Sequence, residues 1–233
     1  MRLATNPEPM IEFHDVSHRF GERTVLRDID LSITERRVAV VGGNGSGKST
    51  LARLFNALLV PTAGRVLIDG LDTRTDAKAI RRKVGFVFQN PDAQIVMPLV
   101  EEDIAFGLKN LRLPKTEIAR KIDDILARYG LAHLRHQHTH NLSGGEKQLL
   151  ALSSVLVMEP EYLVFDEPTT LLDLRNKRMI LRILQELPQT AIVISHDLDM
   201  LDGFDRVLVL HDGRIMADGP PGSTIRRYIE IMT

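Results

Sequence analysis

The sequence predicts an α/β protein with a mainly parallel central sheet and a separate helical insertion. First, apolar runs that end at glycine, acidic or histidine residues alternate with stretches of helical periodicity, as in the strand–helix units of parallel sheets. Second, Val38–Val41 is apolar at every position, as expected of a strand that is buried on both faces. Third, the apolar residues between Val100 and Tyr129 recur at helical spacings, which predicts the insertion.

The first half of the chain begins with short strands separated by polar turns. These strands are expected at Ile11–Phe13, Val25–Leu26 and Leu31–Ile33, before the buried strand Val38–Val41. A helix over Ser49–Leu59 follows and ends near Pro61, because proline stops helices. Arg65–Asp69 and Val84–Phe88 are the next expected strands.

The second half of the chain returns to strands after the helical insertion. Its expected elements are, in order, a helix at Lys147–Met158, a strand at Tyr162–Phe165, a helix at Asn176–Leu187 and a strand at Ala191–Ser195. The runs Arg206–Leu210 and Arg214–Ala217 flank an Asp-Gly pair, Asp212 and Gly213. Because an Asp-Gly turn between two such runs is a strong hairpin signal, a β-hairpin is expected there.

Length and composition exclude several classes of protein. The chain has 233 residues, of which 43% are hydrophobic and 26% charged, with a net charge of −1, as in soluble globular domains. It has no cysteine, which excludes disulfides, thiolate catalysis and cysteine-ligated metal sites. No apolar run approaches the roughly 20 residues that span a bilayer, and no apolar signal region opens the chain, so we expect it in the cytosol. The balanced charge offers no basic field for nucleic acid.

A glycine-rich segment follows the buried strand and opens the first expected helix. Its residues match G-x-x-x-x-G-K-[ST] and are Gly42, Gly43, Asn44, Gly45, Ser46, Gly47, Lys48 and Ser49, with Thr50 after them. Glycines let backbone N–H groups close around phosphate oxygens, and a helix N-terminus favours negative charge. Lys48 is expected to reach the β- and γ-phosphates, and the Ser49 hydroxyl to bind Mg²⁺. A chance glycine-rich turn is the alternative, which the flanking strand and helix disfavour.

Two carboxylates end the apolar run Leu163–Glu167. Acidic groups at the end of a buried strand are costly unless their charge is used there. Because successive side chains of a strand point to opposite faces, Asp166 and Glu167 are expected to act differently. We expect Asp166 to hold Mg²⁺ and Glu167 to be the general base for an attacking water. The alternative is a solvated strand end before a turn at Pro168.

Two further polar residues follow other expected strands. His196 comes directly after Ala191–Ser195, and Gln89 comes directly after Val84–Phe88. Ligands of open parallel sheets bind at the carboxyl ends of the strands. We therefore expect His196 to meet a γ-phosphate, and Gln89 to bind the metal or the water. Each residue alone would be a weak signal, because a lone histidine is more often structural.

The segment Leu142–Gln148, which reads LSGGEKQ, comes just before an expected helix. Ser143 and Glu146 have the spacing of a capping box, and Gly144 and Gly145 expose backbone N–H groups at the helix start. The simple interpretation is a capped helix. The other interpretation is a second anion site. Since the chain already has a complete phosphate loop, such a site would serve a nucleotide held by another copy.

These motifs, in this order, resemble those of the ATP-binding cassette ATPases. The resemblance is carried by the phosphate loop, Gln89, LSGGEKQ, LVFDEP, Asp173 and His196, and it covers about Met10 to Gly219. It implies a single cassette over 1–233, with a RecA-like P-loop NTPase core and an antiparallel β subdomain at about 10–88 and 159–219. It also implies a helical subdomain at about 89–158, and ATP with Mg²⁺ as ligands.

The same resemblance implies a head-to-tail dimer that encloses two ATP molecules. In such a dimer, the segment Ser143, Gly144, Gly145 and Glu146 would face the γ-phosphate bound by the partner's phosphate loop. Phe20 stands where the family places an aromatic residue that stacks on adenine, and Asp173 would lie in the loop that links the two sites. Because each chain has one LSGGE and one Glu167, a homodimer would be competent and is expected.

Two positions depart from the family pattern. Gly43 stands where proline is frequent, which is expected to make the phosphate loop more flexible without removing a phosphate contact. Leu171-Leu172 replaces a smaller and more polar pair before Asp173. The second departure leaves the coupling between the two ATP sites open.

A narrower resemblance covers residues 87–107. The sequence there, VFQNPDAQIVMPLVEEDIAFG, resembles the ATPases of energy-coupling-factor importers of vitamins and metal ions. It implies a peripheral protein at the cytoplasmic face of the membrane, bound to an integral-membrane coupling protein that works with a substrate-capture protein. Biotin is the first expected substrate, and cobalt or nickel ions come next. The stretch Gln89–Met97 would receive the coupling helices, unless Ile95, Val96 and Met97 are ordinary core residues.

Two other functions stay open at this point. A soluble cassette ATPase that acts on nucleic acid or ribosomes usually has two cassettes or a long coiled-coil insertion, and 233 residues hold neither. An ATP-responsive scaffold without hydrolysis is disfavoured by the presence of Gln89, Glu167 and His196. Co-purification with membrane proteins or with nucleic acid would separate these functions.

Overall fold

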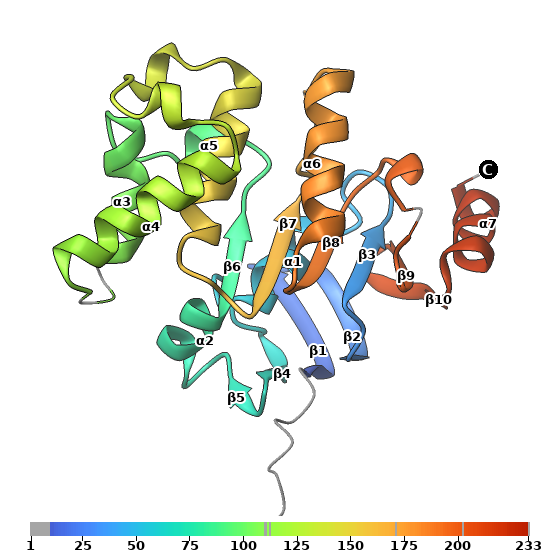
Figure 1. Ribbon diagram of the computed structural model, residues 1–233. Helices are drawn as coiled ribbons and strands as arrows, with labels where there is room; N and C mark the ends of the chain where they lie inside the picture. The colour runs from blue at the N-terminus through green and yellow to red at the C-terminus, as the bar shows by residue number, and fades with distance from the viewer. Residues whose placement is uncertain (1–9, 110, 112, 171, 202, 233) are drawn as a thin grey trace, which may run out of the picture. The chain divides into compact units, whose positions relative to one another are not determined.

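A computed structural model describes residues 10–109, 111, 113–170, 172–201 and 203–232. The chain forms two compact units, which Figure 1 shows together. The terminal unit comprises Met1–Arg81 and Thr190–Thr233, and the central unit comprises Arg82–Gln189. The expected subdomain division, with a helical part at 89–158, stays a prediction. Among the described residues, no helix combines the length and the apolar character needed to cross a membrane.

A four-stranded antiparallel sheet occupies one part of the terminal unit. Its strand order is β2-β1-β4-β5, and the strands are β1 (Ile11–Phe20), β2 (Arg23–Ile33), β4 (Ala63–Ile68) and β5 (Leu71–Asp72). β1 and β2 are longer than the expected runs. The reason is a register shift between Phe13 and Val16, where Asp15 has a φ of 49° and interrupts the alternation of buried and exposed residues.

The other sheet of the terminal unit carries the phosphate loop. Its central strand β3 (Arg37–Val41) is buried at every residue and pairs in parallel with β8 (Thr190–Ile194) and β9 (Arg206–His211). β9 continues through the expected hairpin into β10 (Arg214–Gly219). The buried parallel strand and the hairpin are therefore confirmed.

Helices complete the terminal unit. α1 (Lys48–Phe55) starts at the phosphate loop but ends four residues before the expected Leu59, because Ala57 has a φ of 55° and turns the chain. α7 (Pro221–Met232) packs beside β9 and β10 and was not expected, although Ile225, Tyr228, Ile229 and Met232 have helical spacing. The short helices are α2 (Ala77–Lys83), which leads into the central unit, and η4 (Leu198–Met200).

The central unit contains the helical insertion and two strands. The parallel strands β6 (Val84–Val87) and β7 (Tyr162–Asp166) pair Val87 with Phe165. The helices are α3 (Val100–Lys109), α4 (Lys115–Arg128), α5 (Gly144–Leu156) and α6 (Leu174–Glu186), with short turns η1 (Pro91–Ala93), η2 (Ala132–Leu134) and η3 (Thr139–Asn141). The helices predicted between Val100 and Tyr129 are present as α3 and α4, and α5 packs against both.

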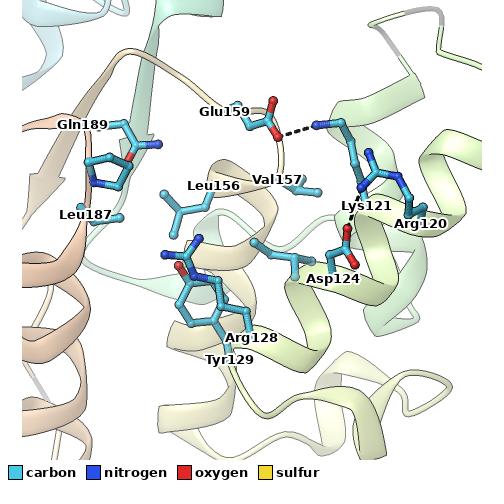
Figure 2. Close-up of a pocket in the computed structure, with 12 residues that line it drawn as sticks. Arg120, Lys121, Asp124, Arg128, Tyr129, Leu156, Val157, Glu159, Leu187 and Gln189 are labelled. Atoms are coloured by element: carbon cyan, nitrogen blue, oxygen red, sulfur yellow. Dashed lines mark hydrogen bonds and ion pairs between the residues drawn. The ribbon is translucent and has the colours of Figure 1, made fainter.

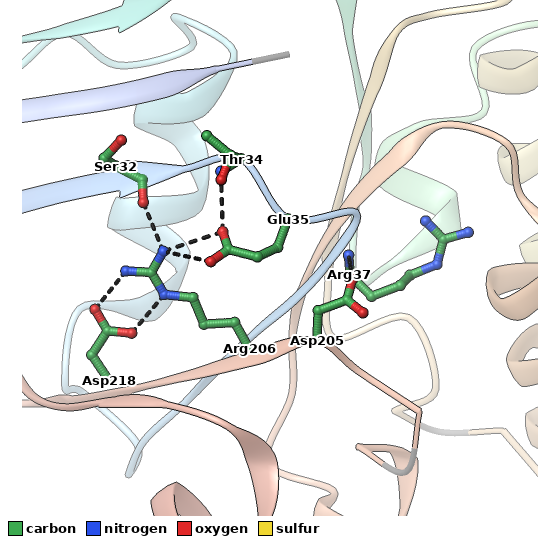
Figure 3. A network of polar contacts seen from close by, with 7 residues as sticks. All are labelled: Ser32, Thr34, Glu35, Arg37, Asp205, Arg206 and Asp218. Carbon is green, nitrogen blue, oxygen red and sulfur yellow. Dashed lines mark hydrogen bonds and ion pairs between the residues drawn. The ribbon is translucent and has the colours of Figure 1, made fainter. Parts of the chain in front are cut away.

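A polar network in the terminal unit joins the end of β2 to β9 and β10 (Figure 3). The guanidinium of Arg206 donates two hydrogen bonds of 2.6 Å to the Asp218 carboxylate, one of 2.7 Å to the Ser32 carbonyl and two longer ones to Glu35. Burial alone would raise the pKa of Glu35, but backbone N–H groups and the Arg206 charge lower it. The network fixes the chain just before β3, the strand that leads into the phosphate loop.

Candidate functional site

The phosphate loop has a conformation that requires its glycines. Gly45 and Gly47 have φ values of 78° and 106°, in the left-handed region. A Cβ on Gly47 would lie 2.9 Å from the Leu26 side chain and 3.0 Å from the Val25 carbonyl oxygen. Lys48 is buried at the start of α1, and its ammonium donates hydrogen bonds of 2.9 and 3.0 Å to the Gly42 and Gly43 carbonyls. A cation thus lies inside a loop of backbone groups, an arrangement that fits a polyphosphate.

The first turn of α1 is also suited to bind an anion. Its N-cap is Gly47, no side chain caps the helix, and no acidic residue lies in the first turn. A helix N-terminus without an acidic residue in its first turn suits a bound anion. Ser49 and Thr50 are half-buried in this turn, and each carries a hydroxyl oxygen of the kind that can coordinate Mg²⁺.

Two more expected residues lie in the terminal unit. The strands β3 and β8 are parallel neighbours, and the Ser195 N–H donates a 3.1 Å hydrogen bond to the Val40 carbonyl. His196 is therefore exposed at the same sheet edge as the start of the phosphate loop. Phe20 ends β1 with half of its surface exposed, and its ring meets His18 edge-on at 4.8 Å. An exposed aromatic face suits stacking on a base, and that role stays a prediction.

The acidic strand end lies beside Gln89 in the central unit. Because Val87 pairs with Phe165, Gln89 and the two carboxylates leave the β6–β7 pair at the same edge. Asp166 is 4% exposed, and its oxygen donors suit Mg²⁺. The expected grouping of Gln89 with Asp166 and Glu167 is therefore present at one sheet edge.

Glu167 itself has an unusual backbone conformation. Its φ of 51° lies in the left-handed region, which costs about 1–3 kcal/mol for a residue other than glycine and is common at functional sites. Its carboxylate accepts a 2.9 Å hydrogen bond from the Thr170 hydroxyl. The sequence analysis did not identify Thr170. Its spacing of three residues from Glu167, within a turn after the strand, is the signal that could have done so.

The LSGGE segment forms the predicted capping box. The Glu146 N–H donates to the Ser143 hydroxyl at 3.4 Å, and the Ser143 N–H donates to the Glu146 carboxylate at 2.8 Å. The hydroxyl and N–H of Ser143 lower the pKa of Glu146. Gly144 is exposed, so the helix start presents backbone N–H groups to the surface of the central unit.

The other signature glycine packs on the next helix. A Cβ on Gly145 would lie 2.4 Å from the side-chain amide nitrogen of Asn176, so a larger residue there would displace the Asn176 amide. Asp173 caps the same helix, α6, and its carboxylate accepts a 2.8 Å hydrogen bond from the Asn176 N–H. Asn176 therefore connects the LSGGE segment with Asp173, a link that sequence spacing did not indicate. Leu171, of the departing pair before Asp173, lies outside the described residues.

Two further side chains hold the stretch after Gln89. Gln94 accepts a 3.1 Å hydrogen bond from the Phe88 N–H and donates one of 2.6 Å to the Ala151 carbonyl of α5. Asp103 is 4% exposed and accepts hydrogen bonds from the Val96 and Met97 N–H groups at 2.9 and 3.1 Å. Sequence analysis missed both roles, because their partners lie in other segments.

The apolar side chains of this stretch are not core residues. Val96 is 60% exposed, and Ile95 and Met97 are half-buried, so the interpretation of all three as ordinary core residues is wrong. The physical reason is that Asp103 draws the Val96 and Met97 N–H groups inward, which leaves the Val96 side chain on the surface. An exposed apolar side chain on a held loop is available to a partner.

A cavity of about 260 Å³ in the central unit is a separate feature (Figure 2). It lies between α4, the end of α5 and residues 187–189, and Tyr129 and Arg128 form one wall. Burial raises the pKa of Tyr129. The cations Arg120 and Lys121 pair with Asp124 and Glu159 at 2.9 and 2.6 Å. None of the residues expected to bind nucleotide lines this cavity, so it is not part of the candidate site.

Comparison with known proteins identifies relatives over nearly the whole chain. A family model described as "ABC transporter" matches residues 26–170. The biotin transport ATP-binding protein BioM of Rhizobium etli is 49% identical over 95% of this chain and 98% of its own length. The energy-coupling factor transporter ATP-binding protein EcfA1 of Symbiobacterium thermophilum is 44% identical over 91% of this chain and 80% of its own length.

A solved structure has the same fold. The structure of cbiO1 from Clostridium perfringens, described as part of the ABC transporter complex cbiONQ, is 34% identical. It covers 97% of this chain and 94% of its own length, with a TM-score of 0.83. The agreement includes the P-loop core and the antiparallel β subdomain, so the fold class predicted from the sequence is confirmed.

Proposed function

Because the chain belongs to the ATP-binding subunits of ABC transporters, we propose that it powers the uptake of a vitamin or transition-metal ion through an energy-coupling-factor importer. ATP hydrolysis coupled to transport is the activity of this family. The observation that carries the hydrolytic mechanism is the conformation of Glu167 directly after β7. Its backbone is in the left-handed region, and its carboxylate accepts a hydrogen bond from the Thr170 hydroxyl. The remaining residues divide into those that bind ATP, those that react and those that face a partner.

In the terminal unit, we assign ATP binding to the phosphate loop. Its backbone N–H groups, from Gly43 to Thr50, surround the phosphates, and the Lys48 ammonium transfers its hydrogen bonds from the loop carbonyls to phosphate oxygens. Phe20 stacks on the base, because its exposed ring offers an apolar face at the end of β1. His196 donates a hydrogen bond to the γ-phosphate from the neighbouring strand end.

In the central unit, we assign the chemistry to the β6–β7 edge. Glu167 accepts a proton from water as the water oxygen bonds to the γ-phosphorus, and the bond from phosphorus to the ADP oxygen breaks. Gln89 orients this water. Asp166 and Gln89 have the oxygen donors that would hold Mg²⁺ at this edge, and the Ser49 hydroxyl is the candidate donor on the phosphate loop. When bound, Mg²⁺ supplies charge neutralisation to the phosphates.

The LSGGE segment is the surface for a second copy of the chain. The N–H groups at the start of α5, with Ser143, Gly144 and Gly145, bind the γ-phosphate on the partner subunit, and Gly144 exposes this helix start. Glu146 holds this helix start, and Asp173 holds the adjacent start of α6. A homodimer is favoured, because each chain has every residue that either half of the site needs.

The importer assignment places the protein at the cytoplasmic face of the membrane, bound to an integral-membrane coupling protein and a substrate-capture protein. It is supported by the names of the relatives and by the exposed Val96 on the loop after Gln89. Biotin is the first candidate substrate, since a relative at 49% identity is a biotin transport protein, and cobalt or nickel ions are next. A nucleic-acid-associated ATPase is the alternative, and its distinguishing result would be co-purifying RNA or DNA.

Glu167→Gln tests the hydrolytic mechanism. The variant retains the shape and the hydrogen-bond acceptor but cannot take a proton, so ATPase turnover is expected to fall by about 100-fold or more while ATP binding remains. A nucleotide-bound dimer should then accumulate in size-exclusion chromatography. Glu161→Gln, which removes an exposed partner of Lys83, is the matched control and should hydrolyse normally. Turnover of Glu167→Gln within tenfold of the native chain would exclude Glu167 as the general base.

The same variant tests the substrate in cells. With Glu167→Gln in place of the native chain, uptake of labelled biotin is expected to stop, whereas Glu161→Gln should support it. Loss of cobalt or nickel uptake with normal biotin uptake would instead assign a metal ion as the substrate. Normal uptake of all three, together with RNA bound to the purified protein, would favour the nucleic-acid alternative.

A further inference from the structure

The phosphate loop is held from outside by the C-terminal part of the terminal unit. The β9–β10 hairpin turn, Asp212 and Gly213, lies against the loop, and its two residues have φ values of 47° and 77°. The buried Gly213 N–H donates a 3.1 Å hydrogen bond to the Ser46 carbonyl. This bond joins positions that are far apart in the sequence and involves no side chain.

The same glycine also binds β2. The Gly213 carbonyl accepts a 2.8 Å hydrogen bond from the Arg27 N–H. Both backbone groups of Gly213 are therefore used, one by the phosphate loop and one by a strand of the antiparallel sheet. Gly213 consequently fixes the distance between the Ser46 carbonyl and the β2 backbone.

The space around Gly213 admits no side chain. A Cβ there would lie 2.4 Å from the Val25 carbonyl oxygen and 3.1 Å from its carbon. These are strand backbone atoms, so they cannot yield by a change of rotamer. The Val25 carbonyl also lies 3.0 Å from the position of a Cβ on Gly47. One peptide group of β2 is thus packed between a glycine of the phosphate loop and a glycine of the hairpin.

The last residues of α7 reach the loop as well. A Cβ on Gly43 would lie 3.1 Å from the Met232 methyl carbon, so the thioether covers this glycine. Gly42 lies even closer to β9, since a Cβ there would lie 2.1 Å from the Leu210 carbonyl oxygen. The segment from β9 to α7 therefore contacts the phosphate loop at three of its residues, Gly42, Gly43 and Ser46.

A charged cavity adjoins this contact. It has a volume of about 430 Å³ and lies between the hairpin turn and Gly45 of the loop. Three of its lining residues are Arg23, Arg27 and Arg214, against one lining acidic residue, Asp212, and Arg214 also pairs with Asp28 at 2.8 Å. An excess of positive charge beside the loop matches the polyphosphate of a nucleotide.

We propose that the C-terminal hairpin and helix position the phosphate loop for ATP, through Gly213 on Ser46 and Met232 on Gly43. Gly213 and Met232 are positioning residues, because neither contacts the ligand and each acts through a loop residue. The proposal rests on the assignment of the loop to ATP binding. It also accounts for Gly43 in place of proline, since this glycine leaves space for the Met232 thioether.

Gly70 provides a matched control for Gly213. Both glycines have a φ of 77°, but a Cβ on Gly70 would meet nothing within 4 Å. Alanine therefore introduces the same left-handed strain at both positions, and only Gly213→Ala meets the Val25 backbone. Met216 is the corresponding control for Met232, because the two methionines are 51% and 48% exposed and no described contact joins Met216 to the loop.

The test measures KM and kcat for ATP hydrolysis with the full chain, at a temperature where circular dichroism shows every variant folded. Displacement of the loop raises KM, whereas partial unfolding lowers kcat and leaves KM unchanged. We expect KM to rise about tenfold in Gly213→Ala and about twofold to threefold in Met232→Ala. Gly70→Ala and Met216→Ala should remain within a factor of 1.5 of the native value, which is on the order of the error of such additive comparisons.

The outcomes separate this inference from the proposed function. A KM for Gly213→Ala and Met232→Ala equal to those of their controls, with ATP turnover by the native chain, would overturn the positioning role alone. If Gly213→Ala does not fold, Met232→Ala against Met216→Ala decides the result. Absence of ATP turnover in the native chain with its membrane partners would instead overturn the proposed function.

Discussion

The two units hold their functional segments by different means. In the terminal unit, the phosphate loop is fixed by backbone hydrogen bonds and by glycines that leave no space for a Cβ, as at Gly47 and Gly213. In the central unit, the stretch after Gln89 and the LSGGE segment are fixed by side chains, chiefly Gln94, Asp103 and Glu146. Substitutions that add side-chain atoms should therefore disturb the functional segment of the terminal unit most. Substitutions that remove side-chain atoms should disturb those of the central unit most.

The difference follows from what each segment must present. A phosphate loop directs its N–H groups at the ligand, so its carbonyls remain for the surrounding chain, and the Gly213 N–H and the Lys48 ammonium use them. The stretch 94–97 has no ligand for its N–H groups, which need an acceptor when buried. Asp103 supplies that acceptor from α3, and one carboxylate serves two N–H groups and the Ser154 hydroxyl.

The largest effect on stability is expected from Asp103→Ala. The change leaves two N–H groups and the Ser154 hydroxyl without their acceptor, and such losses cost about 1–3 kcal/mol each when the groups stay buried. Because water partly reaches the loop and replaces some of these bonds, we expect a total loss of about 3 kcal/mol in the free energy of unfolding. Urea unfolding measures this loss. Asp124→Ala, which breaks an exposed pair with Arg120, is the control and should cost at most about 0.5 kcal/mol. Equal losses in both variants would contradict the claim that the Asp103 side chain holds the stretch after Gln89.

Lys48→Ala is expected to weaken ATP binding strongly and to change the stability of the fold little, the opposite of Asp103→Ala. The Lys48 ammonium donates hydrogen bonds to the Gly42 and Gly43 carbonyls, and the loop is also held by Gly213 and by backbone packing. Loss of a charged hydrogen-bond donor to phosphate should weaken ATP binding by about 2 kcal/mol, or roughly 30-fold. The unfolding free energy should change by less than about 1 kcal/mol.

Titration calorimetry with MgATP and urea unfolding measure the two quantities for Lys48→Ala separately. The exposed Lys78 of α2 offers the control substitution Lys78→Ala, which should bind ATP normally. Unchanged ATP affinity in Lys48→Ala would contradict its role in the loop. A loss of stability as large as that of Asp103→Ala would show that the loop depends on a side chain after all.

The pair of Arg206 and Glu35 sharpens the comparison, because it is a side-chain link inside the terminal unit. The pKa of Glu35 is lowered in the folded protein, so its ionised carboxylate stabilises the fold. This stabilisation is fully present above the pKa of the unfolded chain and is lost as pH falls through the folded pKa. Native stability should therefore decrease on acidification from neutral pH, and Glu35→Gln should show less of this decrease. The difference at pH 7 is expected to be below about 1 kcal/mol, since both side chains are partly exposed.

Thermal unfolding at several pH values measures this difference. Asp30→Asn, in strand β2 before Glu35, is a control, because the Asp30 carboxylate accepts an exposed hydrogen bond from the Asp15 N–H. A native and a Glu35→Gln chain with parallel pH profiles would show that Glu35 does not contribute through its charge.

Local patterns predicted much of the fold and of the site, whereas long-range contacts were not predictable. Val38–Val41 showed its burial in its own composition, and Ser143 and Glu146 showed the capping box in their spacing. The bond from Gly213 to Ser46 joins backbone groups, which leave no trace in the side-chain pattern. The contact of Asp103 with Ser154 spans 51 positions, and either residue alone is typical of a helix surface.

Glu146→Ala is also expected to have a small effect, although it removes part of a predicted motif. The Ser143 N–H loses its acceptor but lies at an exposed helix start, where water can replace it, so the cost should be about 0.5–1 kcal/mol. Because the Glu146 pKa is lowered, this contribution also vanishes as pH falls through its folded pKa. Urea unfolding at pH 7 and pH 3 measures both effects, with Glu186→Ala on the exposed face of α6 as the control. A cost as large as that of Asp103→Ala would mean that burial does not govern which side chains hold the central unit, since Glu146 is far less buried than Asp103.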